Sequence, residues 1–304
     1  MLEVAVVLLR WLQYGGAVVL LGAPLFGLYS FTGRDRRDHV LPRSPLMGAA
    51  LVVALASFAG LSAQTGVMAG SVAEALNPAS LGFVIRETAL GGAMAARGVV
   101  ALLALGALAL LKPGGVAWGL TTGAGLVVAA SFAWSGHAGA ADGAGRYVHL
   151  AADAVHVIAA ALWLGALAAL TLLLSGRARV DEAALHRALH GFAGVGTLAV
   201  SLLVVTGLIN SWFLVGAEGA ATLGASPYGR LLLGKLALFG VMLVLAAVNR
   251  LRLTPALGTD LASGHDPESA LGRLRRSVAA ETLLGAALLG LVAVMGTLAP
   301  PSAG

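Results

Sequence analysis

The sequence predicts an all-α fold: a polytopic membrane bundle of about eight transmembrane helices with both termini on the outward face. Three observations support this prediction. Hydrophobic residues make up 59% of the 304 residues, and the mean hydropathy is +0.91. Charged residues make up only 11%, against about 25% in an ordinary soluble domain. Apolar runs of roughly 20 residues or more, the length that crosses a bilayer as a helix, follow one another along the chain.

These proportions exclude several classes of protein. So few charges could not cover the surface of a soluble globule of this size. The chain has no cysteine, which rules out a disulfide scaffold, Cys-based zinc sites and thiolate chemistry. The net charge of +5 does not indicate nucleic acid as a partner, because the basic residues fall between apolar runs, where the topology of a membrane protein explains them.

The spans follow from the apolar runs and from the prolines that end them. The first run opens Met1-Leu2-Glu3 and is interrupted by Arg10, so we interpret it as a retained span and not as a cleaved signal peptide. Prolines mark the limits of several others, since proline cannot continue a helix. The expected spans are 3–31, 44–70, 88–111, 114–135, 147–175, 189–215, 228–251 and 274–298.

The connections between spans are short. The stretch 71–87 is expected to hold a short interfacial helix broken at Asn77-Pro78. The longest connection, 252–273, is expected to be a loop because it contains Thr254-Pro255 and Asp266-Pro267. No connection is long enough to fold separately, so residues 1–304 are expected to form one integral membrane domain.

The basic residues of the connections set the orientation. Thirteen Lys or Arg follow the odd-numbered spans: Arg34, Arg36, Arg37, Arg43, Lys112, Arg177, Arg179, Arg187, Arg250, Arg252, Arg273, Arg275 and Arg276. The alternate connections hold only Arg86, Arg146 and Arg230. The positive-inside rule places the richer connections in the cytoplasm. Both termini then face outward.

The sharpest group of polar residues lies at the outward start of the fifth span: His149, Asp153 and His156. Their spacings of four and three residues put them on one face of a helix. Ionisable side chains inside a bilayer are costly, so each is a candidate functional residue. The two histidines are roughly 10 Å apart along a straight helix. Either ligands from other segments complete separate sites, or the pair forms steps along a path.

One further histidine and three methionines fall in the same outward half. His137 lies in the preceding connection and could fold back beside His149. Met68, Met94 and Met295 lie at or near outward span ends. Thioether and imidazole together suit Cu(I), and imidazole suits Cu(II), so these residues indicate a soft-metal site in a chain without cysteine.

Each of these residues also has a structural interpretation. Methionine within a span is usually core filler, and His149 suits an interfacial position. Asp153 could simply pair with Arg97 or Lys235, which the topology places at a similar depth, because a buried charge normally has a partner.

Other polar residues point to packing or to the cytoplasmic side. Glu281 could pair with Arg250, or it could form a cytoplasmic cation exit with Asn249. Four amides are candidates for interhelical hydrogen bonds: Gln13, Gln64, Asn210 and Asn249. The remaining histidines, His39, His186, His190 and His265, are expected to be solvated. No Walker loop, dinucleotide fingerprint, HExxH or GxSxG occurs, so we expect a protein that is not an enzyme.

Several short motifs follow one another along the second half of the chain. Residues 149–156 read HLAADAVH and residues 161–165 read ALWLG, preceded by SGHA at 135–138. Further along come YGR at 228–230, then Lys235, then NRLR at 249–252. The final motifs are LRRS at 274–277, Glu281, and GTLAP at 296–300. In this order the motifs resemble those of the copper resistance protein D (CopD/PcoD) family, and the resemblance is most specific over 135–300.

The resemblance implies a multi-pass protein of the bacterial inner membrane that moves copper from periplasm to cytoplasm, often beside a separate periplasmic partner of the CopC type. On this reading copper binds His137, His149 and His156, with Met68, Met94 or Met295 as thioether ligands and Asp153 orienting a histidine. Two alternatives stay open: a membrane redox protein holding haem b or lying near a quinone, and an assembly factor that delivers copper without transporting it.

Overall fold

The computed structural model describes residues 2–31, 41–136, 143, 145–175, 181–221, 223–264 and 266–303. Within them the longer helices are α1 (Leu2–Ser30), α3 (Arg43–Met68), α4 (Pro78–Glu87), α5 (Ala89–Leu110), α6 (Gly115–Ala130), α7 (Arg146–Leu174), α8 (Glu182–Leu214), α10 (Pro227–Val248), α11 (Thr254–Ala262) and α12 (Glu268–Met295). Short helical turns complete them: η1 (Ala73–Leu76), η2 (Ser131–Ser135), α9 (Gly216–Ala221), η4 (Asn249–Leu253) and η5 (Pro301–Ala303).

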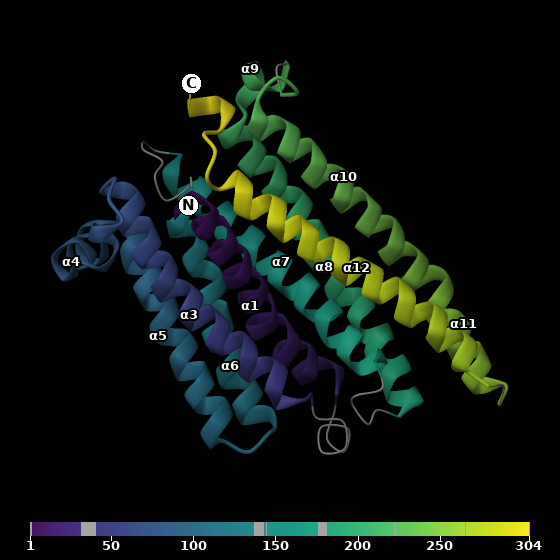
Figure 1. The fold of residues 1–304 in the computed structure, drawn as a ribbon. Helices are drawn as coiled ribbons and strands as arrows, with labels where there is room; N and C mark the ends of the chain where they lie inside the picture. The colour runs from purple at the N-terminus through teal and green to yellow at the C-terminus, as the bar shows by residue number, and fades with distance from the viewer. Residues whose placement is uncertain are drawn as a thin grey trace.

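Eight helical segments of the described chain are long and apolar enough to cross a membrane, which confirms the predicted number of spans. They begin and end within a few residues of most predicted limits. Successive spans alternate in direction, so both termini lie at one end of the bundle (Figure 1). We call this the terminal end and the other the distal end.

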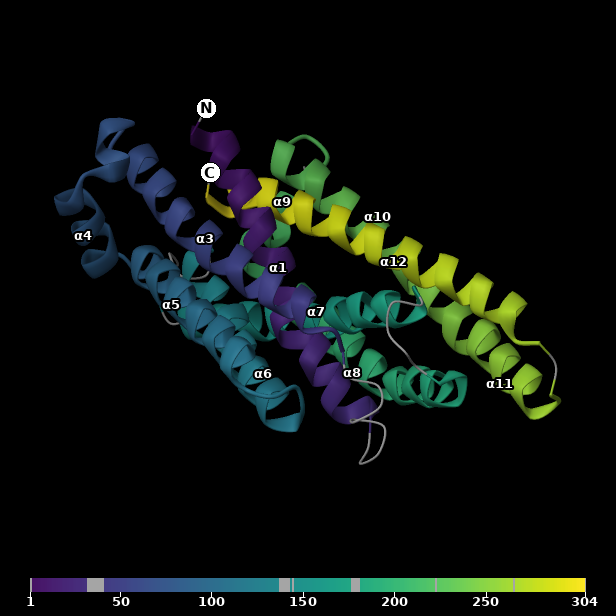
Figure 2. The ribbon, with the colours of Figure 1, turned by 60° about the horizontal axis from the view of Figure 1, so that its bottom comes forward.

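The bundle is arranged around α1 and α7 in its middle. Figures 1 and 2 show α3, α4, α5 and α6 on one side of this pair and α10, α11 and α12 on the other. The helix α1 packs against α3, α6, α7 and α12. Segments far apart in sequence therefore meet along α1 and α7, and the same pair separates the two sides.

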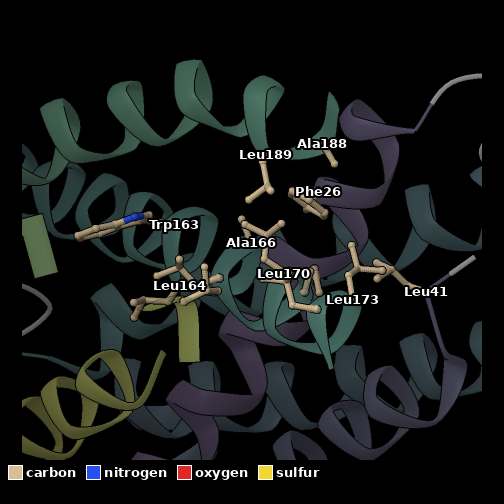
Figure 3. Packing of buried hydrophobic residues seen from close by; sticks show 14 of the residues in the cluster. Phe26, Leu41, Trp163, Leu164, Ala166, Leu170, Leu173, Ala188 and Leu189 are labelled. Carbon is tan, nitrogen blue, oxygen red and sulfur yellow. The ribbon is translucent and has the colours of Figure 1, made fainter. Parts of the chain in front are cut away.

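Two glycines let α1 and α7 cross closely. A Cβ on Gly22 would lie 2.2 Å from the carbonyl oxygen of Ala161 and 2.7 Å from the Cα of Gly165. Small residues are typical of close helix crossings in membranes. Beside the crossing, Phe26 of α1 and a row of leucines on α7 form the main buried core, which Figure 3 shows reaching Ala188 and Leu189 of α8.

The predicted loop at 252–273 is wrong over its first half, because the seventh span continues as a helix to Ala262. Pro255 has no N–H to donate, and in a regular α-helix its ring would clash with the carbonyl of the residue four before it. The chain accommodates it in a π-helical turn, where the N–H of Thr254 bonds to the carbonyl of Asn249, five residues earlier. A proline one residue into α11 thus shifts the helical register without ending the helix.

Two spans also begin earlier than hydropathy predicted. Helix α8 begins at Glu182, where the Asp181 side chain accepts from the N–H of Ala183, and α12 begins at Glu268. These extensions are polar, so hydropathy marks only the apolar part of each helix. The expected short helix within 71–87 is confirmed: Asn77 caps α4 by accepting from the N–H of Ala79.

Candidate metal-binding cavity

A cavity of about 200 Å³ opens at the terminal end of the bundle, among α7, α8, α10 and α12, with α1 and η2 closing one side. We call it the terminal cavity. Of the predicted site residues, the structure brings His149, Asp153, His156 and Met295 to its wall. The 4–3 spacing on α7 therefore does place the three polar side chains on one face, and that face lines a cavity.

His156 is held by a threonine of the facing helix α8. The hydroxyl of Thr206 donates to the carbonyl of Leu202 at 2.6 Å, and the same oxygen lies 2.9 Å from Nδ1 of His156. A hydroxyl has one proton to donate, so Nδ1 of His156 carries the proton and donates it to Thr206. This assigns the lone pair of the ring to Nε2, the atom that would ligate a metal.

His149 lies about two turns of α7 nearer the terminal end than His156, and it is 4% exposed. Its ring stacks on Phe213 of α8, with centroids 4.8 Å apart and planes 7° from parallel. Gly145, which precedes α7, makes this possible, because a Cβ there would lie 2.8 Å from the Phe213 ring. The stacking fixes the plane of the His149 imidazole at the rim of the cavity.

Asp153 lies between the two histidines and takes a long hydrogen bond of 3.4 Å from the amide of Asn210 on α8. The amide oxygen of Asn210 is buried and has no hydrogen-bond partner among the described residues. Lys235 of α10 also lines the cavity and interacts electrostatically with Asp153. No ion pair joins the two in the described structure, so Asp153 keeps acceptor capacity towards the cavity.

Local sequence explains how α10 and α12 reach the cavity. Ser226 caps α10 by accepting from the N–H of Gly229 at 3.0 Å. A Cβ on Gly229 would lie 1.8 Å from the Leu223 carbonyl oxygen, so the preceding turn can close tightly only on a glycine. This places Tyr228 on the wall. Met295, at the last turn of α12, packs with Tyr228 in a small buried cluster.

The wall on the α1 side depends on Arg97, which is 1% exposed. Its guanidinium donates to Gln13 at 2.5 Å, and to Ser131 and Ser135 at 2.9 Å each. It also lies 3.8 Å from the ring centroid of Phe132, a cavity-lining residue. Arg97 is thus not the partner of Asp153. It anchors η2, the segment that leads to residue 137.

Several predicted ligands lie elsewhere or cannot be placed. Met68 is 54% exposed at the end of α3, and Met94 is buried with Leu61 and Val84, so neither lines the cavity. His137 lies outside the described residues. Across the part of the chain that is described, no three His, Asp or Glu side chains stand close enough to ligate one ion.

The size and chemistry of the cavity suit a small cation with water. At about 30 Å³ per water molecule, its 200 Å³ holds roughly seven waters, and typical pockets for larger organic ligands begin near 300 Å³. An imidazole lone pair, a carboxylate, an amide oxygen and a thioether line it. Together they offer ligands of both the soft and the hard kind.

Thr206 and Phe213 were missed by sequence reasoning. Threonine in a membrane helix commonly bonds to its own backbone four residues earlier, and Thr206 does so, which makes it look ordinary. The usable signal was the spacing of four between Thr206 and Asn210, which puts both on one face of α8. Asn210, Gln13 and Asn249 were expected to bond between helices, and that expectation is confirmed.

The fold and the cavity define a multi-pass membrane protein with a polar, histidine-lined cavity between its helices. Two family models match: "Copper resistance protein D-like, N-terminal domain" over residues 1–148, and "Copper resistance protein D" over residues 186–295. The chain belongs to the copper resistance protein D family. It is a protein of the inner membrane with a copper-related function.

Curated relatives support this assignment. The chain is 35% identical to "Copper resistance protein D" of Pseudomonas syringae pv. tomato, covering 96% of this chain and 95% of the relative. It is 28% identical to "Copper transport protein CutJ" of Bacillus subtilis, over 96% of this chain but 52% of the relative. It is 27% identical to "Inner membrane protein YebZ" of Escherichia coli, over 99% of this chain and all of the relative. No solved structure matches the chain.

Proposed function

We propose that this protein carries copper ions from the periplasm into the cytoplasm and that the terminal cavity is where the ion enters. The observation that carries the proposal is the convergence of His149, Asp153, His156 and Met295 on one cavity from two helices. The positive-inside rule puts the terminal end outside, so the cavity would open to the periplasm.

The residues would act in order along the cavity. His149, at the rim, would receive the ion, and His156, about two turns deeper, would bind it through Nε2. Asp153 would offset the charge of the ion, and Met295 would supply a thioether to Cu(I). A periplasmic protein of the CopC type would deliver the ion. The membrane potential, worth about 2.3 kcal/mol per charge per 100 mV, would favour inward movement.

The test is uptake of radioactive copper into sealed liposomes containing the purified protein in a known orientation. The expected result is accumulation from the terminal side, reduced at least about tenfold in His156→Ala. The control is Gln64→Ala, a polar residue of α3 that does not line this cavity and is not among the residues proposed to bind copper. Equal uptake by the wild type and His156→Ala would refute the assignment of the site.

The same preparations separate the alternatives. Copper binding without accumulation would favour an assembly factor over a transporter. An absorption band of reduced b-type haem would favour a redox protein, although a cavity of about 200 Å³ is small for such a group. We propose transport without catalysis.

A further inference from the structure

A second cavity, of about 1000 Å³, lies among the same helices α7, α8, α10 and α12 at the distal end. We call it the distal cavity. Its wall includes Glu281 of α12, Asn249 at the π-helical turn, and His186 and His190 of α8. Helix α11, which follows the turn, closes one side through Thr254 and Pro255.

Glu281 is a buried carboxylate without a cationic partner. It is 1% exposed, and no ion pair to it occurs in the described structure. One oxygen, Oε2, accepts from the Asn249 amide at 3.0 Å. The other, Oε1, is buried with no hydrogen-bond partner among the described residues. The expected pairing with Arg250 is wrong, because that guanidinium donates to Thr197 instead.

Asn249 adds a second unsatisfied oxygen beside the first. Its amide nitrogen bonds to Glu281, and its Oδ1 is buried without a partner within the described ranges. Two adjacent acceptor oxygens with no donor are costly to bury. A cation between them and the cavity would satisfy both, because carboxylate and amide oxygens are cation ligands.

The histidines of the distal cavity were expected to be solvated, and His190 is exposed while His186 is half-buried; both line the wall of the cavity. His186 and His190 are four residues apart and so share one face of α8. The ring of His186 packs against α11 where Gly258 leaves room: a Cβ there would lie 2.7 Å from Nε2. The π-helical turn therefore has two effects. It leads α11 back against α8, and it places Asn249 on the wall of the distal cavity.

We propose that Glu281 and Asn249 form a second copper site, from which the ion leaves towards the cytoplasm, with His186 or His190 as the next ligand on its way out. The proposal rests on copper being the cargo of the terminal cavity. The described residues hold no preformed cluster of three ionisable ligands here, so water completes the coordination and the ion is held weakly. Weak binding suits release, because a conducting site must let its ion leave.

The experiment titrates the purified full-length protein in detergent with Cu²⁺ alone, using calorimetry to count sites and electron paramagnetic resonance to identify ligands. We expect two sites: a tighter one with nitrogen ligands and a weaker one dominated by oxygen. Glu281→Gln keeps the shape but removes the charge, so it should abolish the weaker site alone. Glu182→Gln, at an exposed position of the same end, should change nothing. Two unchanged sites in Glu281→Gln would overturn the proposal.

Two further variants make the outcome decisive. Asn249→Asp adds a second carboxylate, so it should tighten the weaker site by about tenfold or more; an unchanged affinity would overturn the proposal even if Glu281→Gln does not fold. His156→Ala should abolish only the tighter site. If it leaves that site intact while Glu281→Gln removes the weaker one, the proposed entry site fails and the distal site stands.

Discussion

Replacing Thr206 with valine tests how the terminal cavity prepares His156 for a metal. Valine has nearly the shape of threonine but no hydroxyl, so Nδ1 of His156 loses the acceptor that lies 2.9 Å away. Metal binding at Nε2 keeps the ring proton on Nδ1. In the variant, that buried N–H loses its side-chain acceptor whenever the metal is bound.

The expected cost follows from that lost bond. An unsatisfied buried donor costs about 1–3 kcal/mol, and each 1.4 kcal/mol is about tenfold in affinity. The predicted loss is therefore about 5-fold to 150-fold in copper affinity, in line with the 10–100-fold typical of groups that orient a metal-binding histidine. Calorimetric titration of the purified variant with Cu²⁺ measures it directly.

The matched control is Thr121→Val. Thr121 is equally buried and donates to the carbonyl of Ala117 at 2.8 Å in the same way, but it lies away from the cavity. It should lose no copper affinity. If Thr206→Val binds copper within twofold of the wild type, the tautomer assignment of His156 is refuted and so is its role as an Nε2 ligand.

Three other variants test the packing and the electrostatics. Gly22→Ala should lower the free energy of unfolding by about 1–3 kcal/mol, because its Cβ would lie 2.2 Å from a backbone oxygen. The measurement is the melting temperature, and the control is Gly15→Ala, whose Cβ would meet nothing within 4 Å. Equal melting temperatures for the two variants would refute the close crossing. Arg97→Gln should lower the melting temperature and weaken copper binding, because η2 loses its anchor. If the variant changes neither quantity, the anchoring role is wrong. Lys235→Gln should tighten Cu²⁺ binding several-fold by removing a like charge from the cavity, and weaker binding would show that Lys235 supports the site.

Much of the fold was predictable because the bilayer imposes a length and a composition on each span. The error at 252–273 shows where that reasoning ends. Pro255 reads as a helix breaker in sequence, but a π-helical turn supplies a five-residue hydrogen bond that tolerates it. Whether a proline breaks or shifts a helix depends on packing partners that the local sequence does not contain.

The candidate site divides in the same way. His149, Asp153 and His156 were predictable because residues on one helix share a face at fixed spacings. Met94 was also predicted at the site, but it packs against Leu61, away from the cavity. Depth follows from the topology, whereas the neighbour across a helix interface depends on how the helices rotate about their axes. That rotation is a property of the whole bundle.

The two cavities lie between the same four helices but are not continuous in this structure. Along α10, Lys235 lines the terminal cavity and Ala246 the distal one, with fully buried Met242 between them. Leu164 and Met242 pack against Gly285 of α12, where a Cβ would lie 2.6 Å from the first side chain and 3.5 Å from the second. Trp163, beside Leu164 in Figure 3, faces the Phe239 ring edge-on at 5.8 Å.

These apolar side chains form a barrier between the cavities. An ion held by His156 would have to leave its polar ligands to pass Leu164 and Met242, and bare charge in an apolar interior is costly. Met242 places a thioether, a soft ligand, within this barrier. It lies seven residues, about two turns, from both Lys235 and Asn249. We therefore expect transport to require α10 and α12 to move relative to α7, so that Met242 meets each cavity in turn.

Met242→Leu keeps the packing volume but removes the sulfur, and it should slow copper uptake while leaving both binding affinities unchanged. Uptake at the wild-type rate would show that the sulfur takes no part.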